Sequence, residues 1–389
     1  MSELADEHDL GSCAARRRGS SPLFPSKQIN LQDGKMNIEV KKAKASRIHK
    51  VDFDNLVFGQ VLTDHMLRMK YSNGKWRKPR IVPYGPIRMY PALSTLHYGQ
   101  TVFEGLKAFI AKDGAINVFR MNDHIKRFNR SCERLCIPEI DEEVFHDGLI
   151  ELLKIEKAWI PKQKGTSLYI RPFAYATDMS LGVHVAHNYE FMIILSPVGA
   201  YYKEGFKPVK LITAVEHARS VEGGTGAVKT AGNYAASLYA AYQAEKKGFT
   251  QVLWLDGVHR TYVEEVGTMN VCFVINHELV TPNLSGTILA GVTRDSVIRI
   301  ANDWGIRVHE RRIPIDEIIK ASDIGALDEA FGTGTAAVIS PIGQIQHKEK
   351  IITINKGRAG DLALKLFDEI TGIQYGEKPD TFGWITKIR

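Results

Sequence analysis

Residues 223–234 read Gly-Gly-Thr-Gly-Ala-Val-Lys-Thr-Ala-Gly-Asn-Tyr, so small side chains surround one lysine, Lys229, just before a helical pattern. The stretch is not a dinucleotide-binding fingerprint, because that pattern needs a glycine at position 229. It is not a phosphate-binding loop either, because Val228 stands where that loop has glycine before its lysine. Small residues suit an ordinary turn, and they equally let a bulky planar group approach the backbone. The stretch therefore marks Lys229 as a candidate without settling its chemistry.

Four segments elsewhere in the chain favour a functional role for this lysine. Residues 264–270 place two adjacent acids between strand-like runs. Residues 286–294 are rich in glycine and threonine and lead into a helical pattern, whose free N–H groups and dipole suit an anion. Residues 331–337 form a second glycine-threonine turn with spare donors, and residues 96–109 add aromatic and acidic groups from the first half of the chain.

From about residue 38 onward, short strand-like runs alternate with helical patterns, which indicates a mixed α/β fold. Residues 1–37 are charged and turn-rich with little apolar content, so we expect them to be disordered. We expect strands at 115–119, 167–176, 189–195, 251–256 and 271–275, and helices at 122–136, 143–159, 233–246, 293–304 and 360–370.

Several longer motifs follow one another in a recognisable order. They are Tyr-Ile-Arg-Pro at 169–172, Ser-Pro-Val-Gly at 196–199 and Gln-Val-Leu-Trp-Leu-Asp at 251–256. With the segments above, they make the chain resemble the branched-chain amino-acid aminotransferases, of the fold type IV family of pyridoxal-phosphate enzymes. The resemblance runs from about residue 50 to the C-terminus.

The resemblance implies an architecture of two domains with the cofactor, pyridoxal 5′-phosphate, between them. A smaller N-terminal α/β domain is expected over residues 38–201, and a larger cofactor-binding domain with a barrel-like sheet over residues 223–389. Residues 202–222 are expected to form an interdomain loop that closes over the substrate. Members of the family form homodimers, so a homodimer is expected here.

The resemblance also assigns roles in catalysis and cofactor binding. Lys229 would attach the cofactor and, once displaced by substrate, carry the proton between the substrate Cα and the cofactor. Glu265 would pair with the pyridine nitrogen and Tyr234 with the phenolic oxygen, whereas Glu264 is expected to be an exposed acid and Tyr239 and Tyr242 buried aromatics. The residues expected to bind the phosphate group are Arg127, Val292, Thr293 and Thr335.

Substrate recognition is transferred in the same way. The α-carboxylate would meet Tyr98, Thr268 and the backbone at Thr335 and Ala336, while Tyr169 and Arg171 would receive the distal carboxylate of glutamate. An apolar pocket for branched side chains would be formed by Phe58, Phe103, Tyr169, Tyr201 and Ala336.

Composition limits the other classes of protein. The chain of 389 residues is 44% hydrophobic and 24% charged, which is typical of a globular protein rather than a disordered or fibrous one. The net charge is +7, but the first fifty residues hold ten Lys/Arg against six Asp/Glu, so the body is nearly neutral and no nucleic-acid surface is expected. No apolar run approaches the ~18 residues of a membrane span.

The four cysteines are too few and too unevenly spaced for a disulfide framework or a four-ligand zinc site, so no metal is expected. No signal-peptide pattern is present, and cytoplasmic residence is the default expectation. Three alternatives stay open beside transamination of leucine, isoleucine or valine with 2-oxoglutarate. They are a D-amino-acid aminotransferase, an aminodeoxychorismate lyase and a phosphate-binding protein without catalytic activity.

Overall fold

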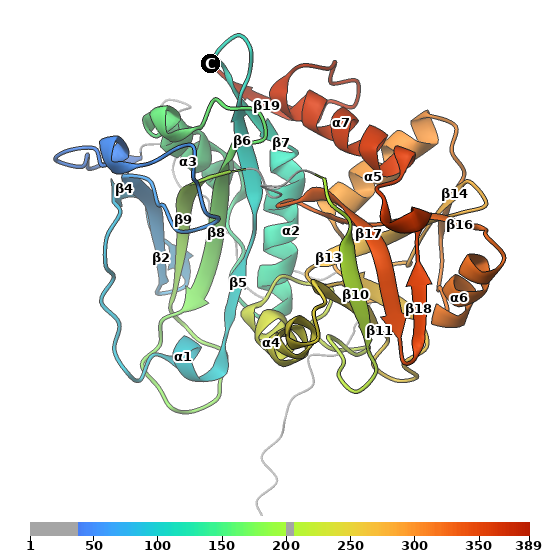
Figure 1. Cartoon of the computed structure of the whole chain (residues 1–389). Coiled ribbons are helices and arrows are strands. Elements are labelled where there is room, and N and C mark those ends of the chain that lie inside the picture. The colour runs from blue at the N-terminus through green and yellow to red at the C-terminus, as the bar shows by residue number, and fades with distance from the viewer. Residues whose placement is uncertain (1–37, 200–205) are drawn as a thin grey trace, which may run out of the picture.

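The computed structural model describes residues 38–199 and 206–389, which form two sheets and the helices that cover them (Figure 1). The expectations for residues 1–37 and for Tyr201 lie outside the described residues. The expected helices and strands are present, with ends displaced by a few residues. The helices are α1 (Ser94–Tyr98), α2 (Met121–Arg134), α3 (Glu142–Ile155), α4 (Ala231–Lys246), α5 (Val292–Asp303), α6 (Ile315–Asp323), α7 (Asp361–Tyr375) and the short turns η1 (Ile48–Lys50), η2 (Lys157–Trp159) and η3 (Asn355–Gly357).

The first sheet is almost entirely antiparallel, and its exception is the parallel pair β1 and β4. In spatial order its strands are β1 (Glu39–Val40), β4 (Arg80–Pro83), β2 (His65–Ser72), β9 (Tyr189–Val198), β8 (Ser167–Ala176), β6 (Leu106–Ile110), β7 (Ile116–Phe119) and β19 (Ile385–Ile388), with β3 (Lys75–Trp76) paired to β2 and β5 (Thr101–Phe103) paired to β8.

The second sheet closes on itself, which confirms the mixed α/β fold with a barrel-like sheet. Pairing between β12 and β13 joins the ends of a six-strand ring, β12-β11-β10-β17-β16-β13. The strands are β10 (Val209–Ala214), β11 (Gln251–Leu255), β12 (Val263–Val266), β13 (Met269–Ile275), β16 (Leu327–Gly334) and β17 (Val338–His347), extended by β14 (Glu278–Thr281), β15 (Val308–Glu310) and β18 (Lys350–Thr353).

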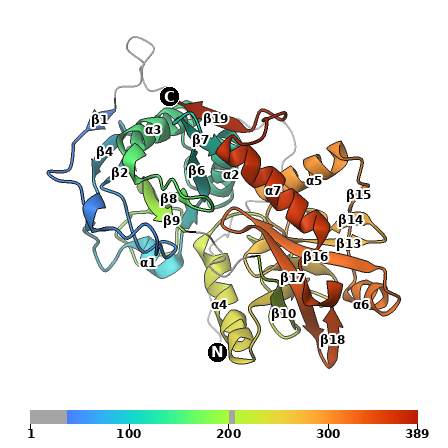
Figure 2. The same cartoon turned by 45° about the horizontal axis from the view of Figure 1, so that its top comes forward.

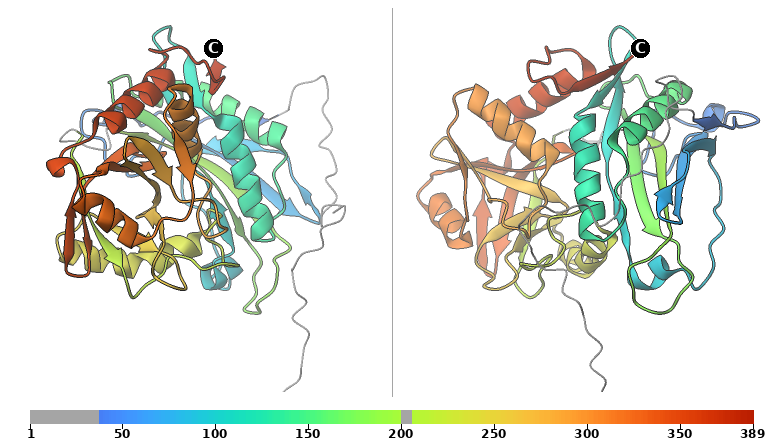
Figure 3. Two further views of the ribbon diagram at one scale, coloured as in Figure 1. Left: turned by 90° about the vertical axis from the view of Figure 1, so that its right-hand side faces the viewer. Right: turned by 180° about the vertical axis from the view of Figure 1, so that it is seen from behind.

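Helices α2 and α3 cover one face of the first sheet, and α2 lies between that sheet and the barrel (Figures 1 and 3). The apolar spacing of α2 buries Ile125, Phe128 and Cys132 on one helical face. Phe128 packs edge-on against Phe145 of α3 and Phe191 of β9, with ring centres 5.5 and 5.4 Å apart. The opposite side of α2 is thereby held toward the barrel.

Two domain boundaries expected from the sequence differ in the structure. The expected loop 202–222 contains β10, which pairs in parallel with both β11 and β17 inside the barrel. The C-terminal strand β19 leaves the barrel domain and pairs with β7 at the edge of the first sheet (Figure 2). The short strand β10 was not predicted because the sequence around it is polar and rich in glycine. The pairing of β19 with β7 joins segments that are far apart in the sequence, so no local pattern indicates it.

Helix α4 presents the opposite face from the one expected. Ala240 and Ala244 are buried against Trp254 of β11, because their small side chains let the helix approach the barrel. Tyr239 and Tyr242, expected to be buried, are 61% and 53% exposed. This contact holds α4 against the barrel, and Lys229 lies two residues before the helix begins.

Candidate active site

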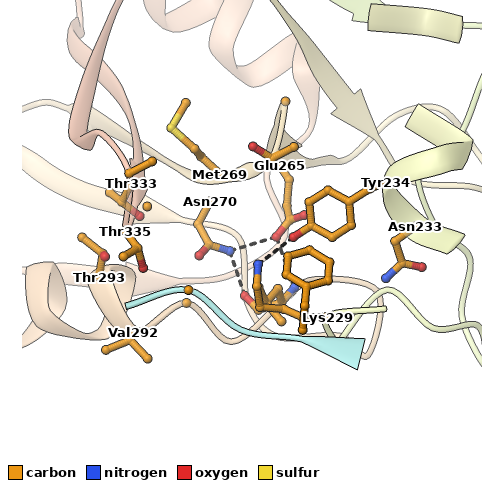
Figure 4. Close-up of a pocket in the computed structure, with 18 of the residues that line it drawn as sticks. Lys229, Asn233, Tyr234, Glu265, Met269, Asn270, Val292, Thr293, Thr333 and Thr335 are labelled. Carbon is orange, nitrogen blue, oxygen red and sulfur yellow. Dashed lines mark hydrogen bonds between the residues drawn. The ribbon is translucent and has the colours of Figure 1, made fainter. Parts of the chain in front are cut away.

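A cavity of about 340 Å³ lies where the first sheet, α2 and the barrel meet. The first sheet contributes β5 and β8, and the barrel contributes β12 and the turn between β16 and β17. The starts of α4 and α5 complete the wall (Figure 4). Segments far apart in the sequence therefore supply one polar, partly enclosed site.

Lys229 is fixed by its backbone and by its side chain. Its N–H donates to the Ser131 hydroxyl at 3.1 Å, and its carbonyl accepts from the Phe103 N–H at 3.0 Å. Its Nζ donates to the Tyr234 hydroxyl at 2.7 Å (Figure 4). Burial lowers the pKa of Lys229 to about 8, although the negative charge of Glu104 opposes the shift. A lysine with this pKa keeps a neutral fraction near pH 7, as a nucleophile or base requires.

Glu265 on β12 lines the same cavity and is buried. Its Oε1 accepts from Asn270 Nδ2 at 3.0 Å and from the Leu289 N–H at 3.2 Å. Its Oε2 lies 2.8 Å from Nε of Arg219. Burial raises the pKa of Glu265, and the Arg219 charge acts against that rise. The carboxylate is thus well placed to face a positively charged group in the cavity.

Glu264 is buried rather than exposed, contrary to expectation. Adjacent strand residues point to opposite faces, so Glu264 faces away from the cavity that Glu265 lines. Its carboxylate accepts a hydrogen bond of 2.5 Å from the Thr287 hydroxyl. The segment before α5 therefore covers this acid, which pattern analysis of one strand does not reveal.

One end of the cavity suits an anion. Arg127 on α2 donates through Nε and Nη2 to the two carboxylate oxygens of Glu104, at 2.8 and 2.6 Å, and through Nη1 to the Ala290 carbonyl at 3.1 Å. A guanidinium has five N–H donors, so it keeps capacity for a ligand. Helix α5 begins alongside with free N–H groups, and the Thr333 hydroxyl is buried without a partner in the described part of the chain. These groups fit a phosphate dianion.

The other end of the cavity is aromatic. The Tyr169 ring packs edge-on against Phe58, with centres 4.8 Å apart, and its hydroxyl accepts from Arg171 Nη2 at 3.0 Å. The Arg171 guanidinium lies 4.8 Å from the centre of the Phe103 ring. A Cβ at Gly105 would lie 1.9 Å from the Tyr169 hydroxyl, so a larger residue here would displace the Tyr169 ring. An apolar side chain and a carboxylate could both be accommodated at this rim.

Thirteen of the expected site residues line the cavity together. They are Phe58, Phe103, Arg127, Tyr169, Arg171, Lys229, Tyr234, Glu265, Thr268, Val292, Thr293, Thr335 and Ala336.

Tyr98 does not line the cavity of its own chain. It is 44% exposed at the end of α1, and its hydroxyl donates to the Leu181 carbonyl. Tyr201 lies outside the described residues.

Sequence reasoning missed several polar residues at this site. Glu104 stands in a motif that was singled out, but no signal showed that it would bond Arg127. Arg219 lies in the expected interdomain loop 202–222, and Asn270 is the last residue of the segment 264–270, in which only the two acids were assigned roles. Lys107 is a second partly buried lysine, whose Nζ donates to the Ala336 carbonyl at 2.7 Å. Their partners come from other elements, so only the folded chain reveals them.

Two other features are absent from the described ranges 38–199 and 206–389. Within these residues, no cluster of three or more His, Cys, Asp or Glu side chains could hold a metal ion. No helix of the same residues is both long and apolar enough to cross a membrane.

Comparison with known proteins points to one family. The sequence model of amino-transferase class IV matches residues 101–345. Branched-chain-amino-acid aminotransferase 2 of Bacillus subtilis (strain 168) is 56% identical over 87% of this chain and 94% of its own length. The crystal structure of the T.th. branched-chain amino acid aminotransferase with pyridoxamine 5′-phosphate is 31% identical, with a TM-score of 0.67 over 82% of this chain and 97% of that one. The same enzyme complexed with N-(5′-phosphopyridoxyl)-L-glutamate superposes with a TM-score of 0.66 at 30% identity, over the same shares of the two chains.

Proposed function

This chain belongs to the class IV aminotransferase family, and we propose that its cavity transfers amino groups between branched-chain L-amino acids and 2-oxoglutarate. The observation that carries the proposal is Lys229, a partly buried lysine with a lowered pKa that bonds Tyr234 in a cavity which also holds the buried acid Glu265. The anion-binding end and the aromatic end of the cavity suit a phosphorylated cofactor and an aliphatic substrate. The 56% identity with a branched-chain aminotransferase supports the same substrate class.

Pyridoxal 5′-phosphate is the cofactor that the site fits, and when bound it supplies an aldehyde carbon and an electron-withdrawing pyridine ring. Arg127 and the first two residues of α5, Val292 and Thr293, would hold the phosphate together with the Thr333 hydroxyl, which has no partner within the described residues. Glu265 would face the ring nitrogen and Tyr234 the phenolic oxygen. The cofactor fits because each charged or polar part of it would meet a complementary group of the cavity wall.

The protein's own groups would then act on the substrate. Lys229 Nζ would remove the proton from Cα of the amino acid, since its lowered pKa leaves part of it neutral. The Tyr234 hydroxyl holds this nitrogen in place at 2.7 Å. Thr268 and the turn at Thr335 and Ala336 would bind the α-carboxylate, which fixes the Cα–H bond relative to the base.

Selection between the two substrates would depend on Arg171. We expect Arg171→Leu to raise KM for 2-oxoglutarate by about 10- to 100-fold, because a charge-assisted hydrogen bond worth about 1.5–3 kcal/mol is lost. Its Nε is buried without a hydrogen-bond partner in the described part of the chain, so it has donor capacity for a carboxylate. Steady-state kinetics with 2-oxoglutarate and with 4-methyl-2-oxopentanoate would test this. An equal loss for both keto acids would exclude the role, because the second has no distal carboxylate.

The visible absorption spectrum tests the proposed function directly. The purified protein supplied with pyridoxal 5′-phosphate should absorb in the visible, lose that band with L-leucine and regain it with 2-oxoglutarate. A protein that stays colourless would remove the transamination proposal and favour a binding protein. A band that responds to D-alanine but not to L-leucine would indicate the D-amino-acid enzyme instead.

Tyr98 supports a homodimer, which we include in the proposal. Its hydroxyl bonds Leu181 in the connection between β8 and β9, where Met179, Leu181 and Val183 are apolar and 63%, 66% and 81% exposed. A second copy covering this surface would bury it and would bring Tyr98 toward the partner's site. Light scattering should give twice the chain mass, and Leu181→Glu should reduce it. A monomer that retains full turnover at micromolar concentration would contradict the proposal.

The cytoplasmic location stays a prediction, which cell fractionation tests.

A further inference from the structure

Arg219 is a buried cation of the cavity wall that the steps above do not use. Its side chain is 8% exposed, and its Nη2 donates to the carbonyl oxygens of Gly226, at 3.4 Å, and Thr287. Its Nε lies 2.8 Å from Glu265 Oε2 although the Nε–H makes no hydrogen bond, so the link to the carboxylate is coulombic. The two carbonyls fix the guanidinium in place beside this one acid.

Three further ionisable groups surround Glu265. Glu264, its neighbour on β12, raises the pKa of Glu265, whereas Lys229 lowers it. The third group is Tyr234 of α4, whose own pKa is raised to about 12, first by burial and then by the Glu265 charge. Among the charged groups around Glu265, Arg219 has the largest effect on the pKa of Glu265. Its positive charge lowers that pKa and so opposes burial, which favours the neutral acid.

We propose that Arg219 is a positioning residue that keeps Glu265 ionised, so that Glu265 can hold a proton on the cofactor's ring nitrogen. The inference rests on the proposed function, because it names the charge that the electron-withdrawing ring depends on. A buried carboxylate without a nearby cation takes up a proton. A carboxylic acid would only donate a hydrogen bond to an uncharged ring nitrogen, and the ring would then accept electrons less readily.

Two substitutions separate charge from packing. Arg219→Gln keeps a donor near the Thr287 and Gly226 carbonyls and removes the charge, whereas Arg219→Lys keeps the charge. Arg294→Gln is the matched control, because Arg294 is also buried and also bonds a carbonyl and a carboxylate, of Pro282 and Glu310, away from the cavity.

The readout is the number of protons exchanged when pyridoxal 5′-phosphate binds, measured by calorimetry at pH 7 in buffers of different ionisation enthalpy. Arg219→Gln should take up roughly one proton fewer than the unchanged protein, because its Glu265 already carries that proton before binding. Arg219→Lys and Arg294→Gln should match the unchanged protein. In a Glu265→Gln background, Arg219→Gln should make no difference.

Kinetics give a second readout that a purely structural role would not reproduce. We expect Arg219→Gln to lower kcat with L-leucine on the order of 10²-fold, as for loss of one preorganised electrostatic group, with KM little changed. Recovery of most of kcat in Arg219→Lys would support the role of charge.

An unchanged proton count in a folded Arg219→Gln protein would overturn the inference. If Arg219→Gln does not fold, the unchanged protein is compared with Glu265→Gln instead. Glu265→Gln should take up about one proton fewer than the unchanged protein when the cofactor binds. Equal proton counts for these two proteins would also overturn the inference. Failure of the proposed function would look different, since the spectrum would then not respond to L-leucine at all.

Discussion

Lys229→Ala is expected to reduce transamination of L-leucine by at least about 10⁴-fold, because one substitution removes both the attachment point and the base. Within the described residues, the hydrogen-bond partner of the Tyr234 hydroxyl is Lys229 Nζ, at 2.7 Å. Borohydride reduction of the protein with pyridoxal 5′-phosphate, followed by peptide mapping, should place the pyridoxyl group on Lys229. The Lys229→Ala protein should gain none at this position.

Lys107 provides the sharpest control for that labelling. It is partly buried near the site, and desolvation lowers its pKa to about 8, as for Lys229. Reactivity alone would therefore permit attachment to either residue. Lys107 Nζ donates to the Ala336 carbonyl, whereas Lys229 Nζ faces the cavity with Tyr234. A label found on Lys107 in the unchanged protein would contradict the assigned role of Lys229.

Local sequence patterns predicted the elements that carry the site. The small residues before α4 marked Lys229, and the glycine-threonine pattern before α5 marked an anion-binding helix end; both segments line the cavity. The motif comparison added Arg127, which in sequence is an ordinary charged residue of an amphipathic helix. These features depend on short-range chemistry, which a single sequence displays.

Features that depend on distant segments could not be predicted in the same way. Glu264 is buried because residue Thr287, 23 positions later, bonds it, and Arg219 meets Glu265 across an even longer stretch of chain. The exposed position of Tyr239 follows from the choice of alanines as the packing face of α4. In each case the deciding partner lies on another element, so the pattern of one segment leaves the outcome open.

Arg127→Met is expected to destabilise the cofactor-free protein by about 3–5 kcal/mol at pH 7, because it leaves a buried carboxylate without its cation. Glu104 is fully buried and bonds Arg127 through both carboxylate oxygens. Denaturant unfolding without cofactor measures the loss. Arg311→Met is the matched control, because its partner Glu317 is 32% exposed and a surface pair is worth at most about 1 kcal/mol.

The dependence of this loss on pH has a definite sign. Burial alone would raise the pKa of Glu104, but the charge and hydrogen bonds of Arg127 outweigh it and hold that pKa far below its usual range. In the unchanged protein, the contribution of the pair is therefore complete above the unfolded pKa of about 4.3 and is lost only as the pH falls below it. In Arg127→Met the pKa of Glu104 rises instead, so the variant's deficit should shrink between pH 7 and pH 5.

The double variant Glu104→Gln with Arg127→Met separates stability from ligand binding. It should recover much of the lost stability, because no buried charge is left unpaired. It should still bind pyridoxal 5′-phosphate more weakly than the unchanged protein, while its affinity for pyridoxal, which lacks the phosphate, changes little. Equal weakening for both ligands would show that Arg127 supports the fold without contacting the phosphate, and the anion-binding end of the cavity would then depend on α5 and Thr333 alone.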